Sequence, residues 1–211
     1  MTTASHIYAS DVAFSPAVKA IQGRKGSREA YAGNEQRGWR TEVDENLETF
    51  LTESNSFYFA TASGDGQPYI QHRGGPKGFL KVLDKQTLAF ADYAGNQQFI
   101  TQGNLSENPK AYIFVMDYAH RRRVKIWGEA RVVEDDEALT MSLMPKGYRA
   151  RPEQVILFKI AAWDTNCPQH IPQKFEAGDV AAALAMRDAR IAELEAELAS
   201  LKGEQAVRVA P

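Results

Sequence analysis

The sequence predicts a mainly β protein, a small antiparallel barrel of about six strands with flanking helices and a C-terminal helix. Three observations predict this class. Short β-rich runs recur between residues 56 and 163, turns containing Gly or Asp separate them, and leucines at heptad spacing follow. Since short turns join antiparallel strands and parallel strands need long crossovers, we expect an antiparallel barrel with helices at its edges.

Composition excludes several classes of protein. The chain has 211 residues, of which 44% are hydrophobic and 25% charged, as in soluble globular proteins. A net charge of -2 argues against a nucleic-acid binder, and no apolar run approaches the roughly 20 residues of a membrane span. No secretory signal is visible, so a cytoplasmic protein is expected. Cys167 is the only cysteine, which excludes an internal disulfide and a multi-cysteine zinc site.

Residues 1–44 read as a polar, helical N-terminal arm. Ser15 followed by Pro16 is a helix-start signal and predicts a helix over residues 17–22. Residues 23–38, rich in Gly, Arg and polar side chains, are expected to form an ordered arm rather than part of the core, and no separate helix is predicted in them. A second helix is predicted over residues 43–52, where Leu47, Phe50 and Leu51 share one face.

The barrel is expected within residues 45–172. The strand-like runs are residues 57–62, 69–83 with an interruption at 74–76, 87–93, 112–116, 123–133 and 155–163. Gly64-Asp65-Gly66 predicts a hairpin after the first run. The run 112–116 lacks alternation and is expected to be buried on both faces. Helices are predicted from Asn96, as N-cap, to before Asn108, and over residues 135–143.

Residues 173–202 are expected to form a C-terminal segment with an amphipathic helix, and the helix itself is predicted over Asp179–Lys202. Leu184, Ile191 and Leu198 are seven residues apart, as are Leu194 and Leu201, which is an a/d heptad seam. Two interpretations stay open: the helix packs on its own barrel, or it pairs with a second copy. Residues 203–211 are expected to be a flexible tail.

No triad, P-loop, dinucleotide fingerprint or zinc-protease motif is present, and the four scattered histidines make a metal site unexpected. In the segment 71–79, Arg73 and Lys77 flank a glycine-rich stretch between strands. Glycines let backbone amides approach an anion, and the two cations add charge. The segment is either an anion site or a β-bulge with solvated cations.

Two further segments could contact such a ligand. Asn96, Gln97, Gln98 and Thr101 lie at an expected helix start, which suits a phosphate but is equally explained by ordinary capping. Arg123, Lys125 and Trp127 share one face of a strand, which suits a planar anionic ligand or a solvated surface.

Polar and aromatic groups also crowd the loop 162–172, directly after the last strand. Cys167 lies there beside Pro168 and is expected to be an inert, non-catalytic thiol. His170 could donate to a ligand or simply hold the loop.

The ordered set of segments resembles the pyridoxamine 5'-phosphate oxidase-like FMN-binding split barrels. The stretches "FATASGDGQPYIQHRGGPKGF", "GNLSENPKAYIFVMDY" and "RRRVKIWGEARVV", with "AWDTNCPQHI", carry the resemblance over residues 45–172. They are similar to a subgroup described only as predicted flavin-nucleotide-binding proteins. The resemblance implies an FMN-binding split β-barrel whose flavin lies between two subunits of a homodimer.

The resemblance implies roles for particular residues. Arg73 and Lys77 match the Arg and Lys of the strand that meets the FMN phosphate and ring, and Arg123 aligns with a glutamine that contacts the flavin. Trp163 corresponds to a late Trp near the flavin. The Arg-Lys pair that the oxidases use for the phosphate is replaced here. The full expected cofactor-binding set is Gln71, His72, Arg73, Lys77, Asn96, Gln97, Gln98, Thr101, Arg123, Trp163, Gln169 and His170.

The function expected is therefore that of an FMN-dependent oxidoreductase with an unknown small-molecule substrate and no assigned catalytic residue. The oxidases' C-terminal Arg-x-His substrate motif has no counterpart here, which argues against pyridoxamine phosphate as substrate. Two alternatives remain open: a non-catalytic protein that stores or senses flavin, and the same barrel binding F420 or haem. Neither nucleic acid nor membrane is an expected partner.

Overall fold

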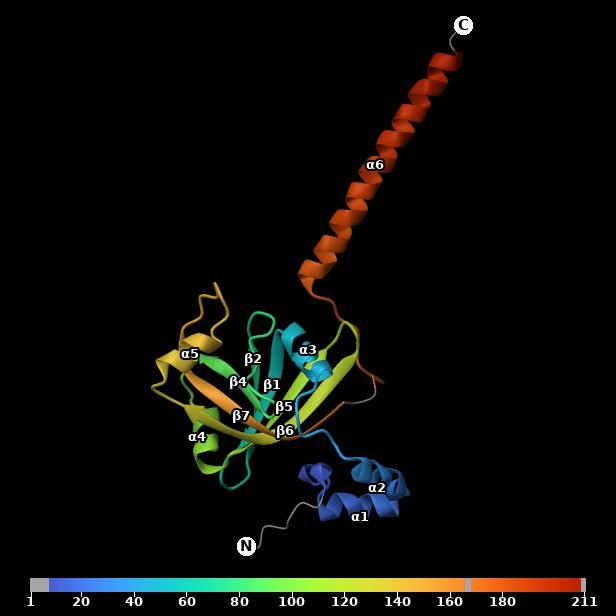
Figure 1. Cartoon of the computed structure of the whole chain (residues 1–211). Coiled ribbons are helices and arrows are strands. Elements are labelled where there is room, and N and C mark those ends of the chain that lie inside the picture. Colours follow the sequence, from blue (N-terminus) through green and yellow to red (C-terminus); the bar gives the residue numbers. More distant parts are fainter. Residues whose placement is uncertain (1–7, 166–167, 210–211) are drawn as a thin grey trace. The chain divides into compact units, whose positions relative to one another are not determined.

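A computed structural model describes residues 8–165 and 168–209, and the barrel consists of one antiparallel sheet (Figure 1). Its seven strands lie in the order β2-β1-β5-β6-β7-β4-β3. The strands are β1 (Ser56–Ala62), β2 (Pro68–Gly74), β3 (Lys81–Val82), β4 (Thr87–Tyr93), β5 (Lys110–Asp117), β6 (Arg122–Val133) and β7 (Pro152–Thr165). The expected six became seven because the interruption at residues 74–76 ends β2, and only two residues resume as β3.

The sheet curls so that one face encloses the hydrophobic core. Phe57 and Phe59 of β1 both make edge-to-face contacts with Phe90 of β4, although β1 and β4 are not neighbours in the sheet. Phe59 also contacts Phe158 of β7, and all four rings are almost fully buried. This architecture is the antiparallel split barrel that the sequence predicts.

Strand β5 corrects one expectation. Ala111, Ile113 and Val115 are buried, whereas Tyr112, Phe114 and Met116 are only half-buried. The run is uniformly apolar, but its outward side chains are large and pack on one another: the Tyr112 and Phe114 rings stack at 6.3 Å. A strand with two apolar faces therefore need not be buried on both.

Gly128 allows β6 and β7 to approach closely at an irregularity in their register between Trp127 and Gly128. A Cβ built on Gly128 would lie 2.1 Å from the Lys159 carbonyl oxygen and 2.6 Å from the Phe158 ring. No side chain fits there, so glycine is a packing requirement at this bulge.

Helices flank the strands. They are η1 (Ala9–Val12), α1 (Pro16–Arg24), α2 (Arg28–Arg37), α3 (Glu45–Glu53), α4 (Ile100–Glu107), α5 (Glu137–Leu143) and α6 (Ala177–Val209). The Ser15 hydroxyl caps α1 as predicted, accepting from the Val18 amide at 3.3 Å. Leu47, Phe50 and Leu51 are the buried face of α3. Helix α2 lies where no helix was expected, because its sequence carries almost no apolar periodicity.

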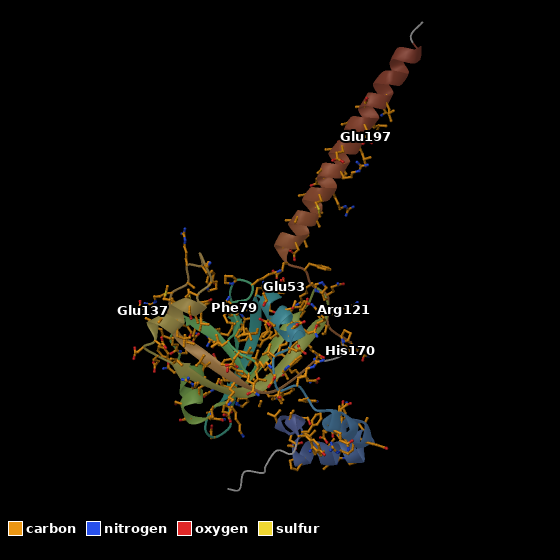
Figure 2. All side chains as sticks on the ribbon, in the orientation of Figure 1. Glu53, Phe79, Arg121, Glu137, His170 and Glu197 are labelled. Atoms are coloured by element: carbon orange, nitrogen blue, oxygen red, sulfur yellow. The ribbon has the colours of Figure 1, made fainter. Side chains whose placement is uncertain are left out.

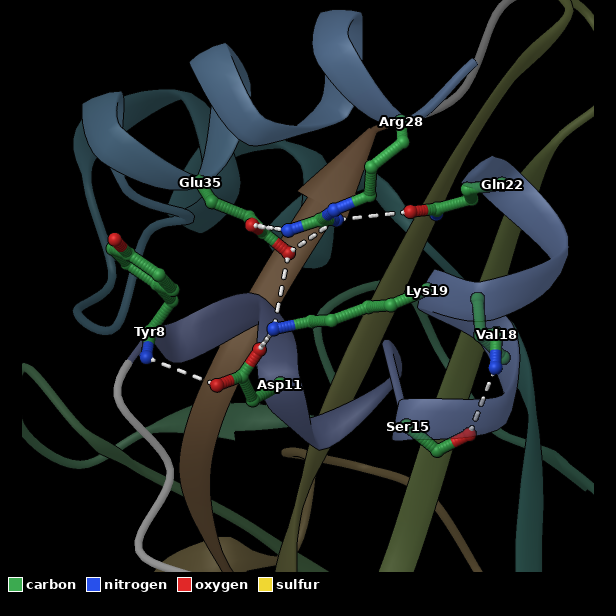
Figure 3. Close-up of polar contacts among 8 residues, drawn as sticks. All are labelled: Tyr8, Asp11, Ser15, Val18, Lys19, Gln22, Arg28 and Glu35. Atoms are coloured by element: carbon green, nitrogen blue, oxygen red, sulfur yellow. Dashed lines mark hydrogen bonds and ion pairs between the residues drawn. The ribbon is translucent and has the colours of Figure 1, made fainter. Parts of the chain in front are cut away.

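Ion pairs hold this N-terminal part together in place of an apolar seam (Figure 3). Glu35 of α2 is buried and pairs with Arg28, and the Lys19 ammonium of α1 lies 3.4 Å from it. Lys19 also contacts Asp11 at 2.5 Å, and Arg28 donates to the Gln22 side chain at 2.9 Å. The hydrogen bond from Arg28, with the nearby positive charge of Lys19, keeps the pKa of Glu35 below its ordinary value.

The start of α4 is a second correction. The helix begins at Ile100, not near Asn96, and its N-cap is Phe99, which lies in the left-handed region with φ 52° and makes no side-chain cap. Asn96 instead accepts a hydrogen bond from the Gln98 amide at 3.3 Å within the preceding loop. Helix α4 is fixed to β1 by a buried hydrogen bond from Asn104 to Thr61 at 3.0 Å.

Among the described residues, 118–120 and 171–209 form a separate compact unit that contains α6. Gln173 donates to the Ala119 carbonyl at 2.7 Å, and the Lys174 ammonium lies 4.6 Å from the Tyr118 ring centroid. The helix continues to Val209, beyond the expected end at Lys202 and into the segment expected to be a flexible tail. No helix in the described part of the chain is long and apolar enough to cross a membrane.

Candidate functional site

A small polar cleft with a cavity volume of about 50 Å³ lies where β2, the end of β4 and the loop before α4 meet. Strand alternation directs Gln71 and Arg73 of β2 to the same side. The loop supplies Asn96, Gln97 and Gln98, and α4 supplies Thr101. The remaining lining residues are Tyr69, Asp92, Tyr93, Gly95, Phe99, Ile100, Gln102, Glu153 and Gln154. The tertiary structure thus brings together six of the twelve expected binding residues from two separate segments.

The loop that forms one wall has an unusual backbone. Gln97 and Phe99 both have positive φ, 58° and 52°, a conformation that side chains other than glycine adopt at a cost. The Thr101 hydroxyl donates to the Gln71 side-chain oxygen at 3.2 Å, which ties the helix to β2. Such strained, tethered loops are typical of ligand sites.

Arg73 is the cation of the cleft, and its charge is already balanced. Its guanidinium is ion-paired with Asp92, and Gln154 donates to the same carboxylate at 3.0 Å. The Arg73 Nε is buried and has no hydrogen-bond partner among the described residues. The cleft therefore offers one unused donor on a neutralised cation, with uncharged amides and a hydroxyl around it.

A tyrosine closes one side of this cleft. Burial raises the pKa of Tyr93, and the neighbouring Tyr148 raises it further. The phenol therefore keeps its proton throughout the neutral range and can act as a hydrogen-bond donor.

The structure does not bring His72 and Lys77 into the cleft. His72 alternates to the opposite, exposed face of β2, where its ring lies 5.7 Å from that of Tyr58. Lys77 follows β2, is exposed and forms an ion pair with Glu53 at 3.2 Å. Arg73 lines the cleft and Lys77 does not, so the two cations do not both face one phosphate there, as the sequence had led us to expect.

Arg123 and Trp163 line a second cleft, together with Arg40, Phe50 and Arg122 among others. The Arg123 Nε is buried without a hydrogen-bond partner in the described structure. Trp163 is only 1% exposed, and its indole N–H donates to the Glu42 carbonyl at 2.8 Å. No residue lines both this cleft and the Arg73 cleft.

The predicted shared face of β6 is present. Lys125 and Trp127 both project from it, and the Lys125 ammonium lies 5.2 Å from the Trp127 ring centroid and 5.5 Å from that of Trp39. Lys125 is also ion-paired with Asp164 at 3.1 Å. The cation on this face is therefore engaged with protein groups.

Gln169 and His170 lie exposed on the turn after β7, and His170 has a positive φ of 64° (Figure 2). Neither lines the Arg73 cleft or the Arg123 cleft. Cys167, expected to be non-catalytic, lies outside the described residues. Among the residues that are described, no cluster of His, Cys, Asp or Glu could hold a metal ion.

Sequence reasoning missed Asp92 and Gln154, the two residues that hold Arg73. Asp92 ends an apolar strand run, and a carboxylate in an otherwise buried strand was a signal available from the sequence. Gln154 gave no signal, because its importance arises only from the pairing of β4 with β7.

The fold and cleft define an antiparallel split-barrel protein with a polar cleft beside β2 and the end of β4. A family model described as pyridoxamine 5'-phosphate oxidase matches residues 43–167, which is more than half of the chain. The protein belongs to this family.

Several solved structures are similar to part of this chain. HupZ of Group A Streptococcus is 16% identical, with a TM-score of 0.49 over 63% of this chain and 99% of HupZ. An F420 reductase is 20% identical, with a TM-score of 0.42 over 58% of this chain and 98% of that chain. HutZ, the heme storage protein from Vibrio cholerae, is 14% identical, with a TM-score of 0.39 over 56% and 89%. No curated protein matches the sequence.

Proposed function

We propose that the protein binds FMN in the Arg73 cleft and serves as an oxidoreductase on a small molecule. One observation carries the proposal: the fold gathers Gln71, Arg73, Thr101 and the loop residues Asn96–Gln98 around one cleft. The buried, unpartnered Arg73 Nε fits a phosphate, which offers an acceptor for it. When bound, FMN supplies the redox chemistry, and the protein residues bind and orient it.

The charge balance sets how the phosphate would be held. Since Asp92 neutralises Arg73, the site depends on hydrogen bonds from Arg73 and the loop amides more than on net charge. The oxidases' Arg-Lys pair is missing at this position, so neutral donors would take its place. The side chains of Asn96, Gln97 and Gln98 are the donors available in that place.

A homodimer is part of the proposal. Arg123 lines a different cleft from Arg73, so a single chain does not present both to one ligand. A second protomer could bring its Arg123 to the flavin held by the first, which is how the resemblance expects the cofactor to be shared. There, a positive charge would stabilise the electron-rich end of the flavin ring.

The test begins with the purified protein, whose bound ligand is identified by absorbance and mass spectrometry. FMN or riboflavin is then titrated into the ligand-free protein and its Arg73→Ala and Lys77→Ala variants. We expect Arg73→Ala to weaken FMN binding by about one to two decades, since a charge-assisted contact contributes roughly 1.5–3 kcal/mol. Riboflavin, which has no phosphate, should lose much less.

Lys77→Ala is the matched comparison. Because Lys77 lies outside the cleft, this substitution should lower the affinity for FMN less than Arg73→Ala does. Equal losses for FMN and riboflavin in Arg73→Ala would move Arg73 from the phosphate to the ring. Bound haem or F420 in place of FMN would overturn the cofactor assignment. Turnover with reduced nicotinamides then separates an enzyme from a flavin store or sensor.

A further inference from the structure

Helix α6 carries a continuous apolar seam that is exposed along its length. Its members recur at alternating spacings of three and four residues, interrupted once by Arg187. They are Val180, Leu184, Ile191, Leu194, Leu198 and Leu201. Leu184 and Leu201, near its two ends, are 52% and 59% exposed. A helix with such a seam is stabilised when the seam packs against another helix.

The charges beside the seam specify which helix fits. With Leu184, Ile191 and Leu198 at a positions, Arg190 and Glu197 occupy g positions, and Glu195 and Lys202 occupy e positions. In a parallel pair in register, each g residue faces the e residue of the partner's next heptad. Arg190 then faces the partner's Glu195, and Glu197 faces the partner's Lys202. Both contacts are attractive, and the two-fold symmetry repeats each of them.

An antiparallel pair is less favourable. Centred on Ile191 against the partner's Leu194, it would set Arg190 against the partner's Glu197, an attractive contact, but also Asp188 against the partner's Glu195, a like-charge contact that cancels it. At its e and g positions the parallel pair has attractive contacts only. Within the single helix, Arg190 is paired with Glu193 at 2.8 Å. Glu195 and Lys202 have no ion pair among the described residues, so they are available to a partner.

We propose that α6 pairs with α6 of a second copy as a parallel, in-register coiled coil over Val180–Lys202. This helix pair uses none of the residues that line the Arg73 cleft, and it adds a second contact to the homodimer of the proposed function, on which it does not depend. Arg187 occupies the one polar d position and faces the partner's Arg187, with the partner's Asp188 beside it. A polar residue at a single core layer fixes register and weakens the pair.

Cross-linking tests the orientation directly. In a Cys167→Ser background, Leu201→Cys places two thiols in one d layer of a parallel pair, so mild oxidation should give a disulfide-linked dimer. Ala196→Cys is the control and should not cross-link, because residue 196 is an f position on the side of the helix opposite the apolar seam. Its neighbour Glu197 is labelled in Figure 2. Equal cross-linking of both variants, or of neither, would overturn the proposal. If the Leu184→Cys and Leu201→Cys variants form a disulfide with each other when mixed, but neither forms one with itself, the helices pair in the antiparallel orientation and the proposal is wrong.

Charge exchange tests the register. Glu197→Lys puts like charges on both sides of the pair and should raise the dimer dissociation constant by roughly tenfold at low salt. Adding Lys202→Glu should restore it, although the two positions do not contact each other within one helix. Arg187→Leu should tighten the dimer. Failure of the double variant to restore pairing would contradict this register. FMN binding, measured at a protein concentration at which each variant is still dimeric, should be unchanged and so reports on the proposed function independently.

Discussion

The ion pair between Arg73 and Asp92 joins the two ends of the sheet. Arg73 lies on β2, the first strand in the sheet order, and Asp92 lies on β4 near the other end. No backbone ladder connects these strands, so side chains close the barrel at this point. Gln154 on β7 donates to the same carboxylate at 3.0 Å. One cluster therefore contributes to the fold and lines the ligand cleft.

Asp92→Asn should raise the preference for FMN over riboflavin. The amide keeps hydrogen-bonding capacity toward its neighbours, but the negative charge near the phosphate is gone and Arg73 gains a full net charge. We expect the FMN-to-riboflavin affinity ratio to rise by roughly three- to tenfold, measured by fluorescence titration. The free energy of unfolding should fall by about 1–3 kcal/mol through loss of the buried pair. An unchanged ratio would place the phosphate away from Arg73.

Gly128→Ala should strongly destabilise the barrel. The added Cβ would lie 2.1 Å from the Lys159 carbonyl, so β6 and β7 must separate at their bulge. Overpacking of this kind costs about 1–3 kcal/mol or more, which denaturant unfolding would detect. Gly103→Ala in α4 is the matched control, because nothing lies within 4 Å of its added Cβ. It should be neutral or stabilising by up to about 1 kcal/mol. Equal effects of the two changes would refute the packing argument.

The N-terminal helices should lose stability in acid through Glu35. Its pKa is lowered in the folded protein, so its stabilising contribution is complete above the unfolded pKa and disappears as pH falls through the folded pKa. Limited proteolysis between about pH 5 and pH 3 should show α1 and α2 becoming susceptible before the barrel. Glu35→Gln should show this susceptibility already at neutral pH. Resistance of the variant at pH 7 would show that the ion pairs are dispensable.

Tyr112 should make the protein sensitive to alkali. Burial raises the pKa of Tyr112 to about 12, with an opposing effect from Arg123. A raised folded pKa means that the contribution is complete below the unfolded value near 10 and is lost as pH rises toward 12. Thermal unfolding temperatures should therefore fall over this interval, and Tyr112→Phe should flatten that fall. Phenolate absorbance near pH 10 should show fewer groups ionising in the folded wild-type protein than in the unfolded chain, because the pKa values of Tyr112 and Tyr93 are both raised, and Tyr112→Phe should reduce this difference by one group.

Much of the fold follows from local sequence. The Gly64-Asp65-Gly66 turn, the run 87–93 that became β4 with the same bounds, and the Ser15 cap each rest on residues close together in the chain. The heptad pattern alone predicted α6, because helical periodicity can be recognised in the sequence without knowing what the helix packs against. Helix α2 escaped detection because two ion pairs of Glu35 stabilise it, one with Arg28 within α2 and one with Lys19 of α1, and these leave no hydrophobic period.

The sequence by itself determined the succession of strands and helices along the chain. It also identified Gln71, Arg73, Asn96–Gln98 and Thr101 as candidate binding residues. Only the tertiary structure decided that these six share one cleft, whereas Lys77 and Arg123 lie elsewhere. The physical reason is that a site depends on distances between strands that are remote in sequence. The partner that neutralises Arg73, Asp92, is 19 residues away and on a strand that never pairs with β2. Such a contact cannot be predicted from the spacing of residues along the chain.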